Sequence, residues 1–358
     1  MKKAKKLLAL TLVFAMALAL AACGGGGGDK EQESGNAGGE GDVYTYKIQC
    51  AYPQGDTSWD LHLPMITKAI TEATDGQIQF EIYAPGSICE PAQAPASVAK
   101  GILDAALSAP NDTAQIVPAA YAEQGIPFYW GTTDEIYDCL YNAGLMDFLR
   151  EEYAKAGIYY GMWDPEGDYA LMTDFPINTA DDLKGKKIRA STSYASLMEL
   201  LGASPVVMSG GDIYMGMKLG TIDGYIYSSA DLEGLALKEV TTNVMVPAGC
   251  AGAPCNIIFN LDKWESMPKE LQDTANKAME DVYSEVSKAA AERDQEARTA
   301  AEAYGVEWIE VSEENMQPFY EAGGEVLEEL AAKYPAAAPG FEIIKEWKAA
   351  QDSKGTAE

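Results

Sequence analysis

The chain contains VYTYKIQCAY (residues 43–52), QIQFEIYAP (77–85) and ILDAALSAP (102–110), three segments with the β-branched and aromatic content of strands. Between the first two, Ser58–Thr74 places apolar residues at helical spacing and stops before Gly76. Ala92–Lys100 is a second expected helix. Strands that alternate with helices are typical of a parallel sheet, so we predict an α/β fold.

The next part of the chain continues this alternation. We expect helices at Asp134–Ala156, Tyr194–Leu201 and Gly210–Leu219, and strands at Ile158–Trp163, Tyr169–Thr173, 186–191, 221–229, 243–249 and 255–260. The last two strand segments resemble a crossing between two sheets. After Pro268, apolar residues recur every three or four positions, which predicts a long helix able to brace two domains.

Length and charge limit the classes of protein. A chain of 358 residues with 47% hydrophobic residues favours two compact globular domains. There are 26 basic residues against 55 acidic ones, a formal charge of −29. Nucleic-acid binding without sequence specificity needs a cationic face, so this partner class is excluded.

The N-terminal region is similar to a bacterial lipoprotein signal. Four lysines within residues 2–6 precede an apolar run, Leu7–Leu20, and then Ala21-Ala22-Cys23. The resemblance implies cleavage before Cys23 and lipidation of its thiol, with residues 1–22 as signal peptide. The run is shorter than the ~20 residues of a membrane span, which disfavours an uncleaved anchor. Residues 23–42 lack large apolar side chains and are expected to be a flexible, lipid-anchored tether outside the cell membrane.

The residues needed for catalysis or zinc binding are scarce. His62 is the single histidine and falls within a helical pattern, where a structural role is expected. With Cys23 lipidated, five cysteines remain: Cys50, Cys89, Cys139, Cys250 and Cys255. We expect buried thiols, with room for one disulfide, and at least one cysteine that is either a free thiol or paired with another chain. Acidic pairs such as Glu166 with Asp168 carry little information in so acidic a chain, and most acids are expected to be solvated.

Several segments together resemble the solute-binding proteins of tripartite ATP-independent periplasmic (TRAP) transporters. These are YAPGSI (83–88), GILDAALSAP (101–110), Ile126-Pro127-Phe128, DDLKGKKIRAS (181–191), residues 201–229 and the NLDKW segment from Asn260. The resemblance implies a two-lobed periplasmic-binding-protein-like fold with a ligand cleft between the lobes and a long bracing helix. We place lobe I at 43–166 plus about 253–292, lobe II at 167–252 plus about 293–330, and a C-terminal segment at 331–358.

In that family, the arginine of the KIR segment forms a salt bridge to a ligand carboxylate, and it corresponds to Arg189. Guanidinium suits this role because its parallel N–H donors match both carboxylate oxygens and it stays charged in a closed cleft. Arg189 also lies at the C-terminal end of its expected strand, where open α/β sheets bind ligands. The alternative is a basic surface patch formed with Lys184, Lys186 and Lys187.

The sequence departs from two branches of the family. Tyr169 and Tyr227 stand where the sialic-acid branch has a second arginine and an asparagine. A branch that binds 2-oxo acids with a metal has Glu-Trp at the positions of Ile226 and Tyr227, and another carboxylate near Cys250. Because these acids are missing, we predict no metal and no cofactor. Further candidate ligand contacts, each of which could instead pack in the core, are Tyr227, Tyr169, Trp163, Trp59, Tyr52, Asn111 and Gly210.

The predicted function is capture of a small-molecule carboxylate by cleft closure, without enzymatic activity. The resemblance implies small and large integral-membrane TRAP subunits as partners. Two alternatives remain at this point: the binding component of an ATP-driven importer, and an exported hydrolase. The sequence does not identify the organic acid.

Overall fold

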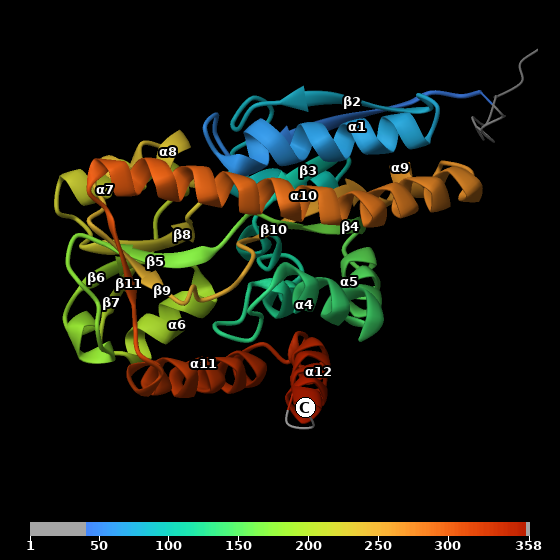
Figure 1. Cartoon of the computed structure of the whole chain (residues 1–358). Coiled ribbons are helices and arrows are strands. Elements are labelled where there is room, and N and C mark those ends of the chain that lie inside the picture. The colour runs from blue at the N-terminus through green and yellow to red at the C-terminus, as the bar shows by residue number, and fades with distance from the viewer. Residues whose placement is uncertain (1–40, 356–358) are drawn as a thin grey trace, which may run out of the picture. The chain divides into compact units, whose positions relative to one another are not determined.

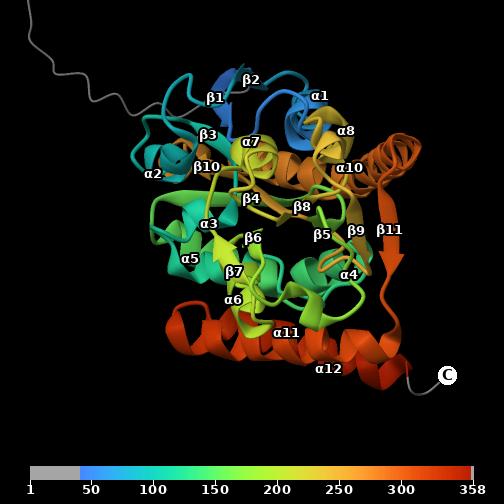
Figure 2. The same cartoon turned by 90° about the vertical axis from the view of Figure 1, so that its left-hand side faces the viewer.

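The computed structural model describes residues 41–355, which form two β-sheets and their helices (Figures 1 and 2). Sheet A has the strand order β2-β1-β3-β10-β4. Its strands are β1 (Tyr44–Cys50), β2 (Ile78–Tyr83), β3 (Ala105–Ser108), β4 (Ile158–Pro165) and β10 (Pro254–Asn260). Sheet B has the order β11-β9-β5-β8-β6-β7. Its strands are β5 (Tyr169–Thr173), β6 (Lys187–Arg189), β7 (Ser204–Val206), β8 (Gly224–Ser228), β9 (Asn243–Val246) and β11 (Glu307–Glu310). We call the part built on sheet A lobe I and the part built on sheet B lobe II.

The α/β prediction is confirmed, but sheet A is mixed rather than parallel. Strands β1, β2 and β3 pair in parallel, as the alternation of strands and helices requires. Strand β10 then pairs antiparallel with both β3 and β4. In this register Asn256 lies opposite Ser108, whose buried hydroxyl donates to Asn256 Oδ1 at 2.7 Å. The difference arises because β10 enters sheet A from lobe II instead of following a helix on the same sheet.

Two extended segments connect the sheets. The chain leaves β4 at Pro165 and enters β5 at Tyr169, and it returns between β9 and β10, so the crossing expected at 243–260 is confirmed. The two connections run side by side: Glu166 N donates to Ala253 O at 3.1 Å, and Ala253 N donates to Gly167 O at 2.7 Å. These two backbone hydrogen bonds hold Glu166 in place between the lobes.

Helix α10 (Lys269–Tyr304) contributes to both hydrophobic cores. It begins directly after Pro268, as predicted, and runs for 36 residues alongside both sheets (Figure 1). Leu271, Met279 and Val286 pack in the core of lobe I, whereas Ala297 and Ala301 pack in a core of lobe II. One rigid helix is therefore shared by the two lobes.

The remaining helices cover the sheets. They are α1 (Leu63–Ala73), α2 (Ala94–Ala99), α3 (Pro110–Thr113), α4 (Thr133–Tyr137), α5 (Leu145–Ala154), α6 (Thr192–Leu200), α7 (Ile213–Lys218), α8 (Asp231–Gly234), α9 (Leu261–Glu265), α11 (Glu313–Lys333) and α12 (Ala338–Gly355). Helix α11 packs on α6 of lobe II, and α12 packs on α5 of lobe I. Sheet B thus has α10 and α11 on opposite sides (Figures 1 and 2). No helix between residues 41 and 355 has the length and apolarity that a bilayer crossing requires.

Two local predictions are corrected. The helix expected at Asp134–Ala156 is split by a π-helical turn, Asp138–Asn142, and by Gly144, whose positive φ of 93° ends the helical path. The disulfide for which the sequence left room is absent: all five cysteines in the described part of the chain are free. Cys50 on β1 and Cys255 on β10 lie on opposite sides of β3, so they are at least two strand spacings, or about 10 Å, apart. That exceeds the reach of a disulfide.

The shared helix generates a stability prediction. Met279 is fully buried against lobe I, so Met279→Ala should lower the free energy of unfolding by about 2–5 kcal/mol through lost packing and a cavity. Glu285 is exposed on the same helix, and Glu285→Ala should change it by less than about 0.5 kcal/mol. Urea denaturation of both variants measures the difference. Equal effects would show that the α10 face does not support the core.

Candidate functional site

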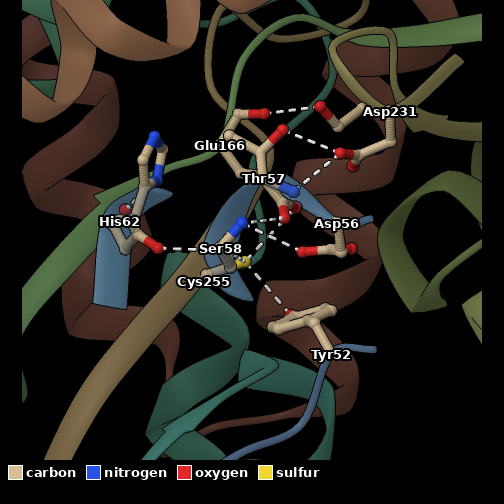
Figure 3. A network of polar contacts seen from close by, with 10 residues as sticks. Tyr52, Asp56, Thr57, Ser58, His62, Glu166, Asp231 and Cys255 are labelled. Carbon is tan, nitrogen blue, oxygen red and sulfur yellow. Dashed lines mark hydrogen bonds and ion pairs between the residues drawn. The ribbon is translucent and has the colours of Figure 1, made fainter. Parts of the chain in front are cut away.

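Three carboxylates are buried where the two lobes meet (Figure 3). Asp56 lies in the loop after β1 of lobe I, Glu166 in the connection after β4, and Asp231 at the start of α8 in lobe II. One oxygen atom from each lies within 4.8 Å of the others. We call Asp56, Glu166 and Asp231 the carboxylate triad.

The loop after β1 holds the triad through hydrogen bonds that span the lobes. The backbone N–H and the hydroxyl of Thr57 donate to Asp231 Oδ1 at 2.8 and 2.7 Å. The N–H of Ser58 donates to Asp56 Oδ1 and to Glu166 Oε1, at 3.0 and 3.2 Å. From lobe II, the Tyr227 hydroxyl donates to Asp56 Oδ2 at 2.9 Å. These bonds place lobes I and II in direct contact.

A glycine pair permits this close approach. A Cβ atom at Gly234 would lie 1.9 Å from the carbonyl oxygen of Gly55, which no side chain could tolerate. Gly55 also has a positive φ of 97°, a conformation that glycine adopts without strain. From α10, Arg293 Nη2 donates to the Gly55 carbonyl at 2.5 Å. The bracing helix, the loop after β1 and α8 therefore meet at one point.

Burial determines the protonation of the triad. Removal from water raises the pKa of Glu166 to about 8, with repulsion from Asp231 as the next cause. Burial also raises the pKa values of Asp56 and Asp231 well above the usual range. Asp56 and Glu166 share a hydrogen bond, which requires a proton on one of them. The triad therefore cannot carry its full negative charge without a compensating positive charge or protons.

His62 is arranged next to the triad but is not a base for Ser58. Its Nδ1 lies 2.6 Å from Asp164 Oδ1, and both side chains are fully buried. The Ser58 hydroxyl donates to the other oxygen of Asp164 at 3.1 Å. Since Ser58 contacts the carboxylate and not the imidazole, the three residues do not form the serine–histidine pair that an exported hydrolase would need.

Arg189 lies at the end of β6 with its charge unpaired. Its Nη1 donates to the Ile226 carbonyl at 2.8 Å and its Nε to the Met208 carbonyl at 3.2 Å. The guanidinium carbon lies 5.3 Å from the centre of the Tyr227 ring. Within the described residues no carboxylate forms an ion pair with this arginine. The half-buried guanidinium is thus positioned by backbone oxygens and a ring, with charge and donor capacity left for an anion.

Tyr227 and Gly210 join Arg189 to the triad. The Tyr227 ring faces the guanidinium while its hydroxyl contacts Asp56. A Cβ at Gly210 would lie 2.7 Å from this hydroxyl, so the glycine leaves space for the tyrosine. Tyr52 is joined to the triad through Cys255, whose thiol donates to the Tyr52 oxygen at 3.1 Å and contacts Glu166 Oε2 at 3.6 Å. The structure therefore brings four of the predicted site residues, Arg189, Tyr227, Gly210 and Tyr52, to one region.

The other predicted residues lie elsewhere. Tyr169 donates to the Ser191 hydroxyl at 3.3 Å and lines an apolar pocket with Tyr194 and Phe319. Trp163 is fully buried and packs edge-on against Trp130 at 5.5 Å. Trp59 is half-buried against the lobe I core, and Asn111 lies in α3. Within the described residues, no hydrogen bond or ring contact joins Trp163, Trp59 or Asn111 to Arg189. Cys23 lies outside the described residues.

The triad is the part of the site that the sequence analysis missed. Its expectation that the acids are mainly solvated fails for Asp56, Glu166 and Asp231, and for Asp164. Glu166 is one of many acids in this sequence, and the other two have no local motif. The one available signal was position: Asp56 follows the first strand, and the C-terminal ends of strands in open α/β sheets face the ligand crevice.

Comparison with known proteins identifies the family. Residues 52–334 match the model of the DctP family, bacterial extracellular solute-binding protein family 7. The chain belongs to this family. The resemblance to TRAP solute-binding proteins seen in the sequence is confirmed.

Relatives in the DctP family share about a quarter of the sequence. A solute-binding protein of Chromohalobacter salexigens is 24% identical, covering 76% of this chain and 81% of the relative. A monocarboxylate 2-oxoacid-binding periplasmic protein of Nostoc is 24% identical over 82% of each chain. An ectoine-binding periplasmic protein of Halomonas elongata is also 24% identical, covering 75% and 80%.

Solved structures show the same two-lobed fold. A TRAP solute-binding protein of Bordetella bronchiseptica, with copurified calcium and picolinate, has a TM-score of 0.80 at 20% identity and covers 88% of this chain and 95% of its own. One from Desulfovibrio salexigens with bound orotic acid has a TM-score of 0.76 at 20% identity, covering 86% and 98%. The predicted fold class is therefore confirmed.

The raised pKa values generate a prediction on pH. Glu166 binds a proton more tightly when folded, with a pKa of about 8 against 4.5, so its contribution to stability is complete below pH 4.5 and is lost as pH rises through 8. Asp294 and Glu123, each with a pKa raised to about 7 by burial, act in the same direction. In buffer with a chelator, the melting temperature should fall between pH 5 and 8.5. Glu166→Gln should flatten this slope, whereas Glu285→Gln should not. A melting temperature that rises with pH would contradict the assignment.

Proposed function

We propose that this protein is the extracytoplasmic receptor of a TRAP transporter and captures an organic acid through Arg189. The observation that carries the proposal is the half-buried guanidinium at the end of β6, held by two backbone carbonyls and unpaired with any carboxylate of the described chain. The Nostoc relative is named for 2-oxoacids, and the solved neighbours hold uronate, picolinate or orotate. Family membership and the unpaired arginine therefore support the same ligand class.

The geometry explains how a carboxylate would be recognised. Two bonds to backbone oxygens fix the plane of the guanidinium, so its remaining N–H groups are preorganised for an anion. The Tyr227 ring supports the cation on one face. A charge-assisted bond of this kind contributes about 1.5–3 kcal/mol, and an unpaired carboxylate in a closed cleft would cost more. Arg189 thus favours acids over neutral solutes.

Contacts between the lobes provide the second half of the mechanism. The bonds from Tyr227 to Asp56 and from Thr57 to Asp231 exist only when lobes I and II meet. A ligand that contacts Arg189 together with groups of lobe I binds the closed form better than the open form. Ligand binding therefore shifts the population toward closure, which is the state that membrane subunits of a TRAP transporter would receive.

Two alternative functions are less well supported. The binding component of an ATP-driven importer could share the two-lobed fold, but the family match and the named relatives favour the TRAP type. An exported hydrolase would need a nucleophile beside a base, and Ser58 contacts Asp164 rather than His62. The proposal is therefore a receptor without catalytic activity.

The ligand is best identified by a thermal-shift screen of residues 42–358 against organic acids, amino acids and sugar acids. At 100 times its dissociation constant a ligand should stabilise the fold by about 2.7 kcal/mol, a shift of a few degrees at this size. Stabilisation confined to one carboxylate class supports the proposal. Stabilisation by neutral sugars alone would contradict it.

Arg189→Ala should weaken binding of the acid found in that screen at least tenfold, and Arg189→Lys nearly as much, because an ammonium cannot reproduce the bidentate geometry. Arg298 is the matched control, since it pairs with Glu302 on the surface of α10. Arg298→Lys should leave the affinity unchanged. Isothermal titration calorimetry makes the comparison. Unchanged affinity in Arg189→Lys would exclude bidentate recognition.

We further propose that Cys23 anchors the receptor to the outer face of the cell membrane. The support is the sequence alone: an apolar run followed by Leu20-Ala21-Ala22-Cys23. Cys23→Ser should move the protein from the membrane to the soluble extracytoplasmic fraction, whereas Cys89→Ser should not. Fractionation and mass spectrometry of the N-terminal peptide measure this. Unchanged membrane association of Cys23→Ser would refute the anchor.

A further inference from the structure

The carboxylate triad contains an oxygen atom with no partner. Asp231 is fully buried, and its Oδ1 accepts both bonds from Thr57. Its Oδ2 is buried and accepts no hydrogen bond from any described residue. An unpartnered carboxylate oxygen in the interior is costly, and here it belongs to a group whose members approach within 4.8 Å. A positively charged ligand between the three side chains would provide this oxygen with a partner and reduce the repulsion among the carboxylates.

We propose that Asp56, Glu166 and Asp231 bind a hard divalent cation of the calcium type at the contact between the lobes. The cation would take oxygens from lobe I, from the connection after β4 and from lobe II. It would replace the proton shared by Asp56 and Glu166 and supply the missing partner of Asp231 Oδ2. This site is additional to the proposed organic-acid site at Arg189.

The surrounding groups favour a metal ion that prefers oxygen. The side-chain cation Arg293 is already engaged by the Gly55 carbonyl and by Asp60 at 3.5 Å. His62 lies with its Nδ1 2.6 Å from Asp164 Oδ1, away from the triad. The Cys255 thiol donates to Tyr52 at 3.1 Å and also contacts Glu166 Oε2 at 3.6 Å, so one sulfur atom borders the three carboxylates. The three side chains that approach within 4.8 Å of one another all offer carboxylate oxygens, and such a donor set suits calcium, magnesium or manganese better than zinc or copper.

The proposed cation site lies at other residues than the metal site of the 2-oxo-acid branch that was compared with the sequence. The prediction of no metal rested on the absence of acids at Ile226, Tyr227 and near Cys250. The triad uses other positions, contributed by three separate segments that the sequence gives no reason to group. Because Asp56 and Asp231 belong to different lobes, an ion bound by both would favour the closed form independently of the organic acid.

Direct binding of metal tests the proposal. The protein is treated with EDTA, dialysed, and titrated with CaCl₂ by calorimetry and thermal shift at pH 8, without organic acid. We expect a saturable heat and a shift of several degrees at 100 times the dissociation constant. Tb³⁺ should show luminescence excited through the nearby tyrosines, Tyr52 and Tyr227, and Ca²⁺ should displace it.

Asp231→Asn is the decisive variant because it preserves Oδ1 and its Thr57 partners and replaces only the unpartnered Oδ2. It should weaken Ca²⁺ binding and Tb³⁺ luminescence at least tenfold. Glu123→Gln is the matched control: Glu123 is also fully buried, with Oε1 bonded to Asn256 and Oε2 unpartnered, but it has no neighbouring carboxylate cluster. It should change Ca²⁺ affinity less than twofold.

Two results would overturn the proposal: no saturable effect of Ca²⁺, Mg²⁺ or Mn²⁺ on the wild-type protein, or equal Ca²⁺ affinity of wild type and Asp231→Asn. Wild-type Tb³⁺ luminescence keeps the test valid if the variant fails to fold. The outcome is separable from that of the proposed function, because organic-acid binding is measured in EDTA and depends on Arg189. Loss of acid binding in Arg189→Ala with unchanged Ca²⁺ binding would support two distinct sites.

Discussion

Like charges buried together are the constraint on which the contact between the lobes depends. Asp56, Glu166 and Asp231 come from the two lobes and from the segment that joins them, and all three are removed from water. Their proximity is tolerated because backbone N–H groups of Thr57 and Ser58, the Tyr227 hydroxyl and shared protons or a cation reduce the repulsion. The state of these three groups therefore influences how firmly the lobes hold together.

Helix α10 holds the two lobes in the arrangement that brings the triad together. Because its side chains belong to cores of both lobes, it restricts how the two sheets move, and Arg293 on the same helix holds the Gly55 carbonyl next to the triad. Tyr227 then connects the triad to Arg189, with its hydroxyl on Asp56 and its ring on the guanidinium. Tyr227 therefore contacts both Arg189 and the triad, so one side chain joins the proposed anion site to the contact between the lobes.

Much of the local structure was predictable because it depends on short-range patterns. Apolar residues at helical spacing predicted α10, and β-branched segments predicted β1, β2 and β3. The split of Asp134–Ala156 was missed because a π-helical turn and a glycine at positive φ leave the apolar periodicity nearly intact. The place of Arg189 at the end of β6 was predictable because the surrounding segment has the pattern of a single strand.

The sequence by itself determined the α/β class, the long helix, the crossing between sheets, the family and the place of Arg189 at the end of a strand, since each rests on neighbouring residues or on an ordered set of motifs. Only the tertiary structure decided the carboxylate triad. Asp56, Glu166 and Asp231 are ordinary acids in a chain with 55 of them, and no local pattern distinguishes the buried ones. Their pKa values and their capacity to bind a cation arise from burial and mutual distance, which exist only after both lobes have folded and met.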